Sequence, residues 1–310
     1  MTPRLVFAGT PDFALASLKA LVESGHRPVT VYTQPDRPSG RGKKLTASPV
    51  KTYALEQGIE VRQPVTLKDD EAAREFEALE PDLFIVAAYG LLLPQRILDI
   101  PVHGCVNVHA SVLPRWRGAA PIQAAIREGD AETGISLMAM TAGLDEGPVF
   151  VSRSTPIGDN ESAGELHDRL AAIGGVLLAE NIDALSRGEL SSTPQDDDRA
   201  SYAGKIATAD AALDWSRPAA ELRRQVLAYN PVPGCFFEHE GQRIKVWDAE
   251  LAGDTDANAG QVISADGDGV VVACGDAALR LLTLQRPGKG RVNAREFTAA
   301  LDLSGQDLGA

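Results

Sequence analysis

The sequence predicts an α/β fold: a doubly wound, mainly parallel, Rossmann-like sheet followed by a small OB-like β-barrel. Its 310 residues exceed what one compact core usually takes. Short β-rich runs alternate with amphipathic segments up to about residue 188, and beyond about residue 208 strand patterns meet at Gly-containing turns. We therefore expect a first domain over 1–188, a linker over 189–207 and a second domain over 208–310.

The first domain alternates strand and helix patterns. Short apolar runs predict its strands: RLVFAG, PVTVYT, DLFIVAAY, CVNVHA and GISLMAM. Apolar residues at helical spacing lie between them in FALASLKALVES, DEAAREFEALE, APIQAAIREG and a long helix over about 163–186. This order predicts parallel pairing with right-handed crossovers.

The segment over 189–207 is polar, rich in Ser and Asp, and lacks an apolar period, which is typical of a linker. Beyond it the pattern predicts one helix over about 218–229, then strands in CFFEHEGQRIKVWDAE, QVISADGDGVVVAC and ALRLLTLQ. These strands meet at Glu-Gly and Asp-Gly, which are hairpin signals. They predict an antiparallel barrel of about five strands, a fold that commonly binds oligonucleotides.

Composition restricts the class of protein. The net charge of −13 opposes whole-surface attraction to nucleic acid or anionic membrane, so a polyanion has to meet a local basic patch. Three cysteines without a CxxC pair fit neither a disulfide framework nor a zinc ribbon. The longest apolar stretch, 83–93, is far shorter than a membrane span, and the first residues do not resemble a secretory signal. We expect a cytoplasmic monomer that has no contact with membranes.

Asn107 and His109 are the first candidates for chemistry. They stand two positions apart in CVNVHAS, so both side chains project from one face of the predicted strand. Turn residues over 111–118 follow, which places the pair at the carboxyl end of the strand, where open α/β sheets bind ligands. An amide beside an imidazole can stabilise an oxyanion and move a proton. On spacing alone, a hydrogen-bonding pair without a catalytic role also fits.

Asp145 is the expected third member of this group. It lies in the Gly-rich loop TAGLDEGPV, after the GISLMAM strand, so the loop can carry it to the same edge of the sheet. A carboxylate beside an imidazole holds the ring in one orientation. The residues alone therefore indicate a candidate site of Asn, His and Asp.

The segment NVHASVLPRWRGAAPIQ resembles the signature of the folate-dependent formyltransferases: Asn-x-His, then Ser-x-Leu-Pro and an Arg-Gly turn. GLDEG supplies the Asp of that signature. FAGTPDFA, TQPDRPSGRGKKL, AAYGLLLP, NPVPGCF and KVW resemble in particular the members of this family that formylate methionyl-tRNA, and they are spread over essentially the whole chain. The one departure is Val112, where the family usually has Leu, and it should not affect the chemistry.

This resemblance implies a formyl donor, 10-formyltetrahydrofolate, and an acceptor, the free α-amino group of methionine on initiator methionyl-tRNA. It implies direct transfer through a tetrahedral intermediate, without a covalent enzyme intermediate, because an amine is already a nucleophile. Asn107 and His109 would bind the oxyanion. Asp145 would orient His109 and assist proton transfer toward the departing folate nitrogen.

The resemblance also places the reduced folate beside the loop after the strand. Four residues would hold the pterin through their backbone: Ser111, Val112, Leu113 and Pro114. Apolar residues in 89–92 and 138–144 would add walls, although core positions explain them equally well.

The loop TQPDRPSGRGKKL is a second candidate binding site. It carries Arg37, Arg41, Lys43 and Lys44 among prolines and glycines, a composition that also fits an ordinary solvated loop. The resemblance implies that this loop enters the tRNA acceptor stem, with Arg41, Lys43 and Lys44 on the RNA. Basic residues over 280–295 form a second group in the barrel domain, and both groups favour an RNA partner.

Other kinds of site are disfavoured. The four histidines outside the candidate site are scattered, so we expect no metal site. Cys105 fits a small buried side chain better than a nucleophile. AGTPDFA, after the first strand, lacks two of the three glycines of a dinucleotide-binding fingerprint, which disfavours an NAD enzyme.

Three alternative functions stay open. A glycinamide ribonucleotide formyltransferase would share Asn, His and Asp but would end near residue 210. A sugar-nucleotide formyltransferase could carry a second domain, which in bifunctional forms is a dehydrogenase with a Gly-rich fingerprint. A non-catalytic RNA-binding protein on the same fold would be expected to have lost at least one of the three residues.

Overall fold

The computed structural model describes residues 3–39 and 44–309. The chain divides into two compact units, each built from separate stretches of sequence. The first unit contains residues up to 121, 132–156 and 167–203. The second contains 122–131, 157–166 and the chain from 204 onward. Two short stretches from the first 188 residues therefore fold with the C-terminal part of the chain.

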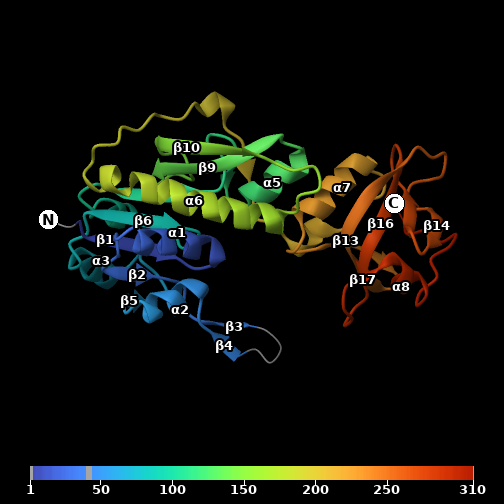
Figure 1. Cartoon of the computed structure of the whole chain (residues 1–310), viewed down its shortest axis with the longest axis horizontal. Helices are drawn as coiled ribbons and strands as arrows, with labels where there is room; N and C mark the ends of the chain where they lie inside the picture. The colour runs from blue at the N-terminus through green and yellow to red at the C-terminus, as the bar shows by residue number, and fades with distance from the viewer. Residues whose placement is uncertain (1–2, 40–43, 310) are drawn as a thin grey trace. The chain divides into compact units, whose positions relative to one another are not determined.

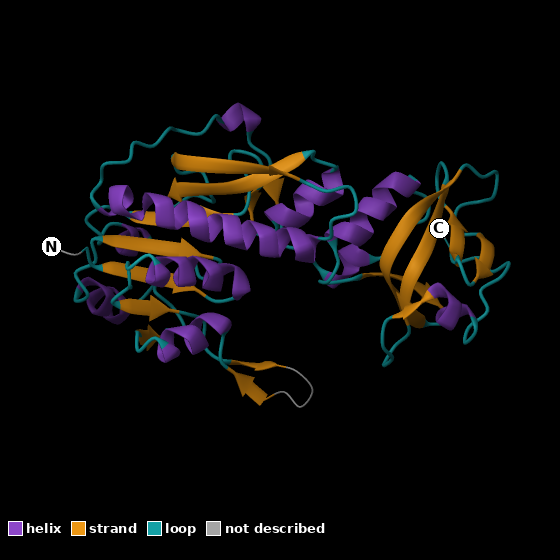
Figure 2. Cartoon of the chain, in the orientation of Figure 1, coloured by secondary structure: helices purple, strands orange, loops and turns teal. Residues whose placement is uncertain are grey.

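A seven-stranded sheet forms the centre of the first unit, in the order β10-β9-β7-β6-β1-β2-β5 (Figures 1 and 2). Its strands are β1 (Leu5–Gly9), β2 (Thr30–Tyr32), β5 (Glu60–Arg62), β6 (Leu83–Ala87), β7 (Cys105–His109), β9 (Glu132–Ala139) and β10 (Val149–Pro156). The strands from β7 to β5 pair in parallel, whereas β9 pairs antiparallel with both β7 and β10. The predicted doubly wound, mainly parallel sheet is confirmed.

The two faces of this sheet are covered by different elements. The long helix α6 (Ala163–Ser186) lies along one face (Figure 1), where a Cβ added to Gly174 would stand 3.1 Å from Val108. The other face carries a buried apolar cluster that includes Phe76 and Phe84, whose ring centroids lie 4.8 Å apart. Every residue of β1 and β6 is buried, as parallel strands covered on both faces require.

Side-chain caps fix where two helices of the first unit begin. Its shorter helices are α1 (Asp12–Glu23), α2 (Pro49–Glu56), α3 (Asp70–Glu77) and α4 (Gln95–Leu98). The side chain of Ser48 accepts a hydrogen bond from the backbone of Lys51 at the start of α2, and Asp69 accepts one from Ala72 at the start of α3. The sequence pattern did not predict α2, because the apolar residues of this short helix give only a weak periodic signal.

A two-stranded hairpin of β3 (Arg37–Ser39) and β4 (Lys44–Thr46) projects after β2 (Figure 1). Its base is fixed by the ammonium group of Lys51, which lies 2.7 Å from a carboxylate oxygen of Asp36 and 2.7 Å from Oε1 of Gln63. Gln63 in turn donates to the other carboxylate oxygen of Asp36 at 2.8 Å. Hydrogen bonds from Lys51 and Gln63 lower the pKa of the Asp36 carboxyl group below its usual value.

The second unit is built around an antiparallel sheet in the order β12-β13-β16-β15-β14, with β17 paired to β16. Its strands are β12 (Cys235–His239), β13 (Gln242–Gly253), β14 (Val262–Asp266), β15 (Gly269–Ala273), β16 (Ala278–Gln285) and β17 (Val292–Asn293). Its helices are α7 (Ala219–Ala228), α8 (Ala294–Thr298) and most of α5 (Pro121–Glu128). The predicted C-terminal domain of antiparallel strands is confirmed.

β9 and β10 depart from the simple parallel pattern. β9 was expected, but it runs antiparallel to β7 and pairs Ala139 with Val106. β10 was not predicted, because VFVSRSTP is poor in large apolar residues, and it lies exposed at the edge of the sheet. None of the helices in the described ranges combines the length and the apolar character needed to cross a lipid bilayer.

Candidate active site

Asn107 and His109 lie in the C-terminal half of β7, and both side chains face Asp145. Nδ2 of Asn107 lies 3.4 Å from Oδ1 of Asp145, and Nδ1 of His109 lies 3.7 Å from Oδ2. His109 is buried, whereas Asn107 and Asp145 are half-buried and keep contact with solvent. The structure therefore brings together the three side chains that the sequence singled out.

Asp145 reaches this place through the loop over 140–148. Because β9 runs antiparallel to β7, the chain leaves β9 beside Val106, and the loop brings it back to His109. Asp145 has a φ of 52°, in the left-handed region that non-glycine residues rarely occupy. The backbone N–H of Gly118 donates to its Oδ2 at 2.8 Å, a charge-assisted bond that fixes the carboxylate.

His109 is held from its other side by a backbone carbonyl. Its Nε2 lies 3.0 Å from the carbonyl oxygen of Trp116, which can only accept, so Nε2 carries a proton and donates it. Nδ1 is then the nitrogen that faces Asp145. Trp116 itself has a φ of 62°, so this carbonyl is aimed by an unusual backbone turn.

The loop after β7 contains the four residues expected to hold the pterin: Ser111, Val112, Leu113 and Pro114. Ser111 and Leu113 are buried, and Val112 and Pro114 are half-buried. Ser136, in β9, donates to the carbonyl of Ser111 at 2.8 Å and accepts from the N–H of Leu113 at 3.1 Å. Sequence reasoning missed Ser136, although a serine inside an apolar strand was the available signal.

The loop is closed by a short parallel pairing between β8 (Arg117–Gly118) and β11 (Tyr202–Ala203). β11 belongs to the segment expected to be a linker, and this part of it is bonded into the first unit. Gln195, from the same segment, donates to the carbonyl oxygens of Asp145 and Gly147. Nothing in its polar surroundings in the sequence indicated such a contact.

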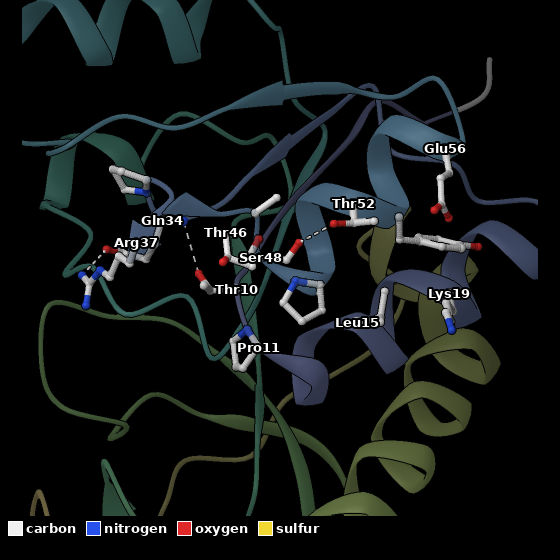
Figure 3. A pocket seen from close by; sticks show the side chains of 14 residues that line it. Thr10, Pro11, Leu15, Lys19, Gln34, Arg37, Thr46, Ser48, Thr52 and Glu56 are labelled. Atoms are coloured by element: carbon white, nitrogen blue, oxygen red, sulfur yellow. Dashed lines mark hydrogen bonds between the residues drawn. The ribbon is translucent and has the colours of Figure 1, made fainter. Parts of the chain in front are cut away.

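The expected RNA-binding residues are only partly described. Lys44 is exposed in β4, whereas Arg41 and Lys43 lie outside the described residues. A cavity of about 650 Å³ lies at the base of the hairpin (Figure 3). There the side chain of Thr10 accepts from the backbone N–H of Gln34 at 3.2 Å, and Arg37 donates to the Gln34 side chain at 3.0 Å. The cavity lies between the base of the hairpin and the helices α1 and α2.

The three cysteines are free thiols and buried, which bears on whether they could act as nucleophiles or metal ligands. Burial raises the pKa of the Cys105 thiol to about 12, so this thiol stays protonated and unreactive at neutral pH. Burial raises the pKa of Cys235 to about 12 and that of Cys274 to about 11. Among the described residues, no three His, Cys, Asp or Glu side chains are grouped to hold a metal ion.

Two family models match the chain. The model described as formyl transferase matches residues 3–182, and the model described as formyl transferase, C-terminal domain, matches residues 205–301. The methionyl-tRNA formyltransferase of Pseudomonas paraeruginosa is 53% identical over 285 residues, which are 92% of this chain and 92% of the relative. That of Hydrogenovibrio crunogenus is 50% identical over 307 residues, which are 99% of this chain and 98% of the relative.

Solved structures of low sequence identity share the fold. WlaRD, a sugar 3N-formyl transferase, is 16% identical with a TM-score of 0.68 and covers 94% of this chain and 100% of its own. HypX from Aquifex aeolicus, in complex with tetrahydrofolic acid, is 17% identical with a TM-score of 0.64 and covers 99% of this chain and 49% of its own. Glycinamide ribonucleotide transformylase 1 from Symbiobacterium toebii is 20% identical with a TM-score of 0.53, and it covers 63% of this chain and 95% of its own.

Proposed function

Because the chain belongs to the formyl transferase family, we propose that it transfers a formyl group from 10-formyltetrahydrofolate to the α-amino group of methionine on initiator methionyl-tRNA. The observation that carries this proposal is 50–53% identity, over nine-tenths or more of both chains, to relatives named methionyl-tRNA formyltransferase. Formylation of the initiator would serve translation initiation. We further propose that the enzyme acts as a cytoplasmic monomer.

In the proposed reaction, the methionine nitrogen attacks the formyl carbon, and the carbonyl oxygen takes up the displaced electron pair. Asn107 donates a hydrogen bond to this oxyanion, and His109 donates one through Nδ1 once that nitrogen has taken up the proton released by the attacking amine. The contact of 3.4 Å between Asn107 and Asp145 is long for a hydrogen bond, so little is lost when the amide turns to the oxyanion.

Collapse of the tetrahedral intermediate breaks the bond between the formyl carbon and the folate nitrogen. The attacking nitrogen has to lose a proton, and the departing nitrogen has to gain one. Asp145 lies beside Nδ1 of His109 and half-exposed to solvent, so this pair can take the proton from one nitrogen and deliver it to the other. Gly118 and Trp116 keep the pair in place.

We propose that the reduced folate lies against the loop of Ser111, Val112, Leu113 and Pro114. The backbones of Ser111 and Leu113 already bond to Ser136, so the half-buried Val112 and Pro114 are left to meet the pterin. Leu92 and Leu144, on loops after β6 and β9, are 75% and 56% exposed. Such exposed leucines suit the apolar part of a bound ligand.

We propose that Arg41, Lys43 and Lys44 contact the phosphates of the acceptor arm. The hairpin that carries Lys44 projects from the first unit, and its base is fixed by Lys51 and Asp36. The neighbouring cavity has room for part of a nucleotide, and Arg37 stands at its edge. A local group of cations of this kind is what an acidic protein needs to meet RNA.

The family match over 205–301 argues against a glycinamide ribonucleotide enzyme, which would have no need for the C-terminal domain. The sugar 3N-formyl transferase WlaRD shares the fold at only 16% identity, so its substrate does not carry over. Loss of catalysis is disfavoured because Asn107, His109 and Asp145 are all present and adjacent.

The decisive experiment offers the purified protein 10-formyltetrahydrofolate and charged initiator methionyl-tRNA. We expect the methionine to be formylated, and elongator methionyl-tRNA to be a poorer acceptor. Glycinamide ribonucleotide and a nucleotide-linked amino sugar serve as competing acceptors. Transfer to either of these, with none to initiator methionyl-tRNA, would overturn the proposal.

A further inference from the structure

The segment over 193–203 returns to the Asp145 loop after α6. Thr193 and Val149 exchange two backbone hydrogen bonds, of 2.8 and 2.9 Å. The side-chain nitrogen of Gln195 donates to the carbonyl oxygen of Asp145 at 2.8 Å and to that of Gly147 at 2.7 Å. Both hydrogens of this carboxamide are therefore used to hold one short stretch of backbone.

The oxygen of the same carboxamide binds Arg117. Its Oε1 accepts from Nε of Arg117 at 3.0 Å, and another guanidinium nitrogen of Arg117 pairs with Asp197 at 2.7 Å. The Arg117 side chain is only 2% exposed. Burial lowers the pKa of Arg117, but hydrogen bonds with Asp197 and Tyr202 outweigh burial and raise it, so the buried group stays charged.

Gln195 thus contacts, from two sides, the groups that position the Asp145 carboxylate. On one side it binds the carbonyl of Asp145, whose φ of 52° is costly and has to be maintained by surrounding contacts. On the other side it binds Arg117, the residue before Gly118, and the N–H of Gly118 holds Oδ2 of Asp145. A shift of the carboxamide therefore changes both the backbone and the hydrogen-bond donor that aim the carboxylate.

We infer that Gln195 is a positioning residue for formyl transfer: its carboxamide holds the Asp145 loop in the one conformation that directs the carboxylate at Asn107 and His109. The inference rests on the proposed function for its kinetic readout, and on the geometry alone for its structural readout. A residue needed only for folding would instead lower activity only as far as it lowered the folded fraction, and the kcat of the folded enzyme would stay unchanged.

Two substitutions separate these roles. Gln195→Ala removes all three hydrogen bonds. Gln195→Glu keeps the side-chain length and an acceptor for Arg117, but an ionised carboxylate cannot donate to the two carbonyls.

We expect both variants to lower kcat by about 10-fold to 100-fold, the scale of misplacing a catalytic group by about 1 Å. KM for both substrates should stay nearly unchanged, and Gln195→Glu should stay folded at the assay temperature, because its carboxylate pairs with the Arg117 guanidinium. Asp198→Ala, an exposed position in the same segment, is the matched control and should behave as wild type.

Hydrogen exchange followed by mass spectrometry gives a readout that needs no activity. Peptides that cover Gly118 and 141–147 should exchange faster in both Gln195 variants and stay unchanged in Asp198→Ala. Full kcat in folded Gln195→Glu, a loss confined to KM, or unchanged exchange would each overturn the inference. A wild-type protein without transfer to methionyl-tRNA would refute the proposed function, and the exchange data would still decide whether Gln195 holds the loop.

Discussion

The backbone N–H of Gly118 donates to Oδ2 of Asp145 at 2.8 Å, so a glycine supplies the donor that fixes the acid of the candidate site. Gly118 has a φ of 114°, and an added Cβ would stand 2.6 Å from the carbonyl oxygen of Ala203. An L side chain meets both a disfavoured backbone conformation and a collision with backbone there. The Arg-Gly turn in the sequence is therefore explained by the conformation that aims this N–H.

Gly118→Ala should both destabilise the first unit and lower kcat. The left-handed strain costs about 1–3 kcal/mol, and the contact with Ala203 forces the backbone, with its N–H, away from Asp145. Urea unfolding and steady-state kinetics measure the two effects. Gly104→Ala is the control, because Gly104 has a φ of 76° with no heavy atom within 4 Å of an added Cβ. It should lose stability and keep kcat, and equal losses of kcat in both variants would contradict the role given to Gly118.

Removal of any of the three central side chains should slow the transfer step. Asn107→Ala, His109→Ala and Asp145→Ala should each lose about 2.7 kcal/mol or more of transition-state stabilisation, the scale for an oxyanion donor. Single-turnover rates with bound initiator methionyl-tRNA measure this loss, and circular dichroism checks the fold. Glu146→Gln, at the exposed position beside Asp145, should keep the wild-type rate. A folded variant with full turnover would remove its residue from the mechanism.

The sequence predicted the strands around the site well, because burial on both faces leaves a plain apolar signal in β1, β6 and β7. The pairing of Asn107 with His109 followed from the alternation of side chains along a strand. The sequence did not predict the path by which the chain brings Asp145 to the site, because the antiparallel direction of β9 is decided by long-range pairing. Gln195 could not be found either, because one polar side chain in a polar segment carries no periodic signal.

The boundaries of the two units also depend on contacts that local sequence patterns do not show. The stretches 122–131 and 157–166 group with the chain after residue 204, although each continues an ordinary helix or loop pattern. Arg224 donates to the carbonyl of Arg127 at 3.0 Å, and the N–H of Gly164 donates to the carbonyl of Asn230 at 3.0 Å. Such contacts join residues far apart in the sequence, which no reading of neighbouring residues can supply.

The lowered pKa of Asp36 predicts how stability depends on pH. Its folded pKa lies below its unfolded value, so the carboxylate stabilises the fold above about pH 4, and this stability is lost as the pH falls through the folded pKa. Asp36→Asn should therefore lose less of its free energy of unfolding than wild type between pH 6 and acidic pH. Urea unfolding at a series of pH values measures the difference.

The double variant provides the control for this pH effect. Lys51→Met removes the largest cause of the lowered pKa, so Asp36→Asn should change the pH dependence much less in that background than in wild type. An Asp36→Asn variant with the same acid sensitivity as wild type would show that the Lys51 pair contributes nothing measurable to stability.

Cys105 should take no part in the reaction. Its side chain is buried and its thiol has a pKa of about 12, so a thiol reagent at pH 8 should modify it only after unfolding. Cys105→Ala should keep kcat, with a stability loss on the order of 1 kcal/mol for the small cavity. Mass spectrometry after iodoacetamide treatment, with and without urea, tests accessibility. Loss of kcat in folded Cys105→Ala would reopen a nucleophilic mechanism.

The hairpin should contact the tRNA, because an acidic protein that acts on tRNA has to place cations where the phosphates pass. Arg41→Ala should cost about 1–3 kcal/mol in tRNA-dependent catalysis, because a planar guanidinium can grip a phosphate or guanine edge with two hydrogen bonds. If Arg41 reads the acceptor end, the cost should be larger with initiator than with elongator tRNA. Lys43→Ala and Lys44→Ala should weaken both tRNAs alike and flatten the salt dependence by about one unit of slope each.

A salt series of kcat/KM for tRNA, with folate binding measured in parallel, separates these effects. Folate binding should stay unchanged in every hairpin variant, because the folate is assigned to the loop after β7. Lys68→Ala, an exposed lysine outside the hairpin, is the matched control, since a general loss of positive charge would lower the slope there as well. If the triple variant at Arg41, Lys43 and Lys44 had the salt slope and tRNA kinetics of Lys68→Ala, the hairpin would be an ordinary solvated loop. The basic residues over 280–295 would then be the next candidates for the RNA contacts.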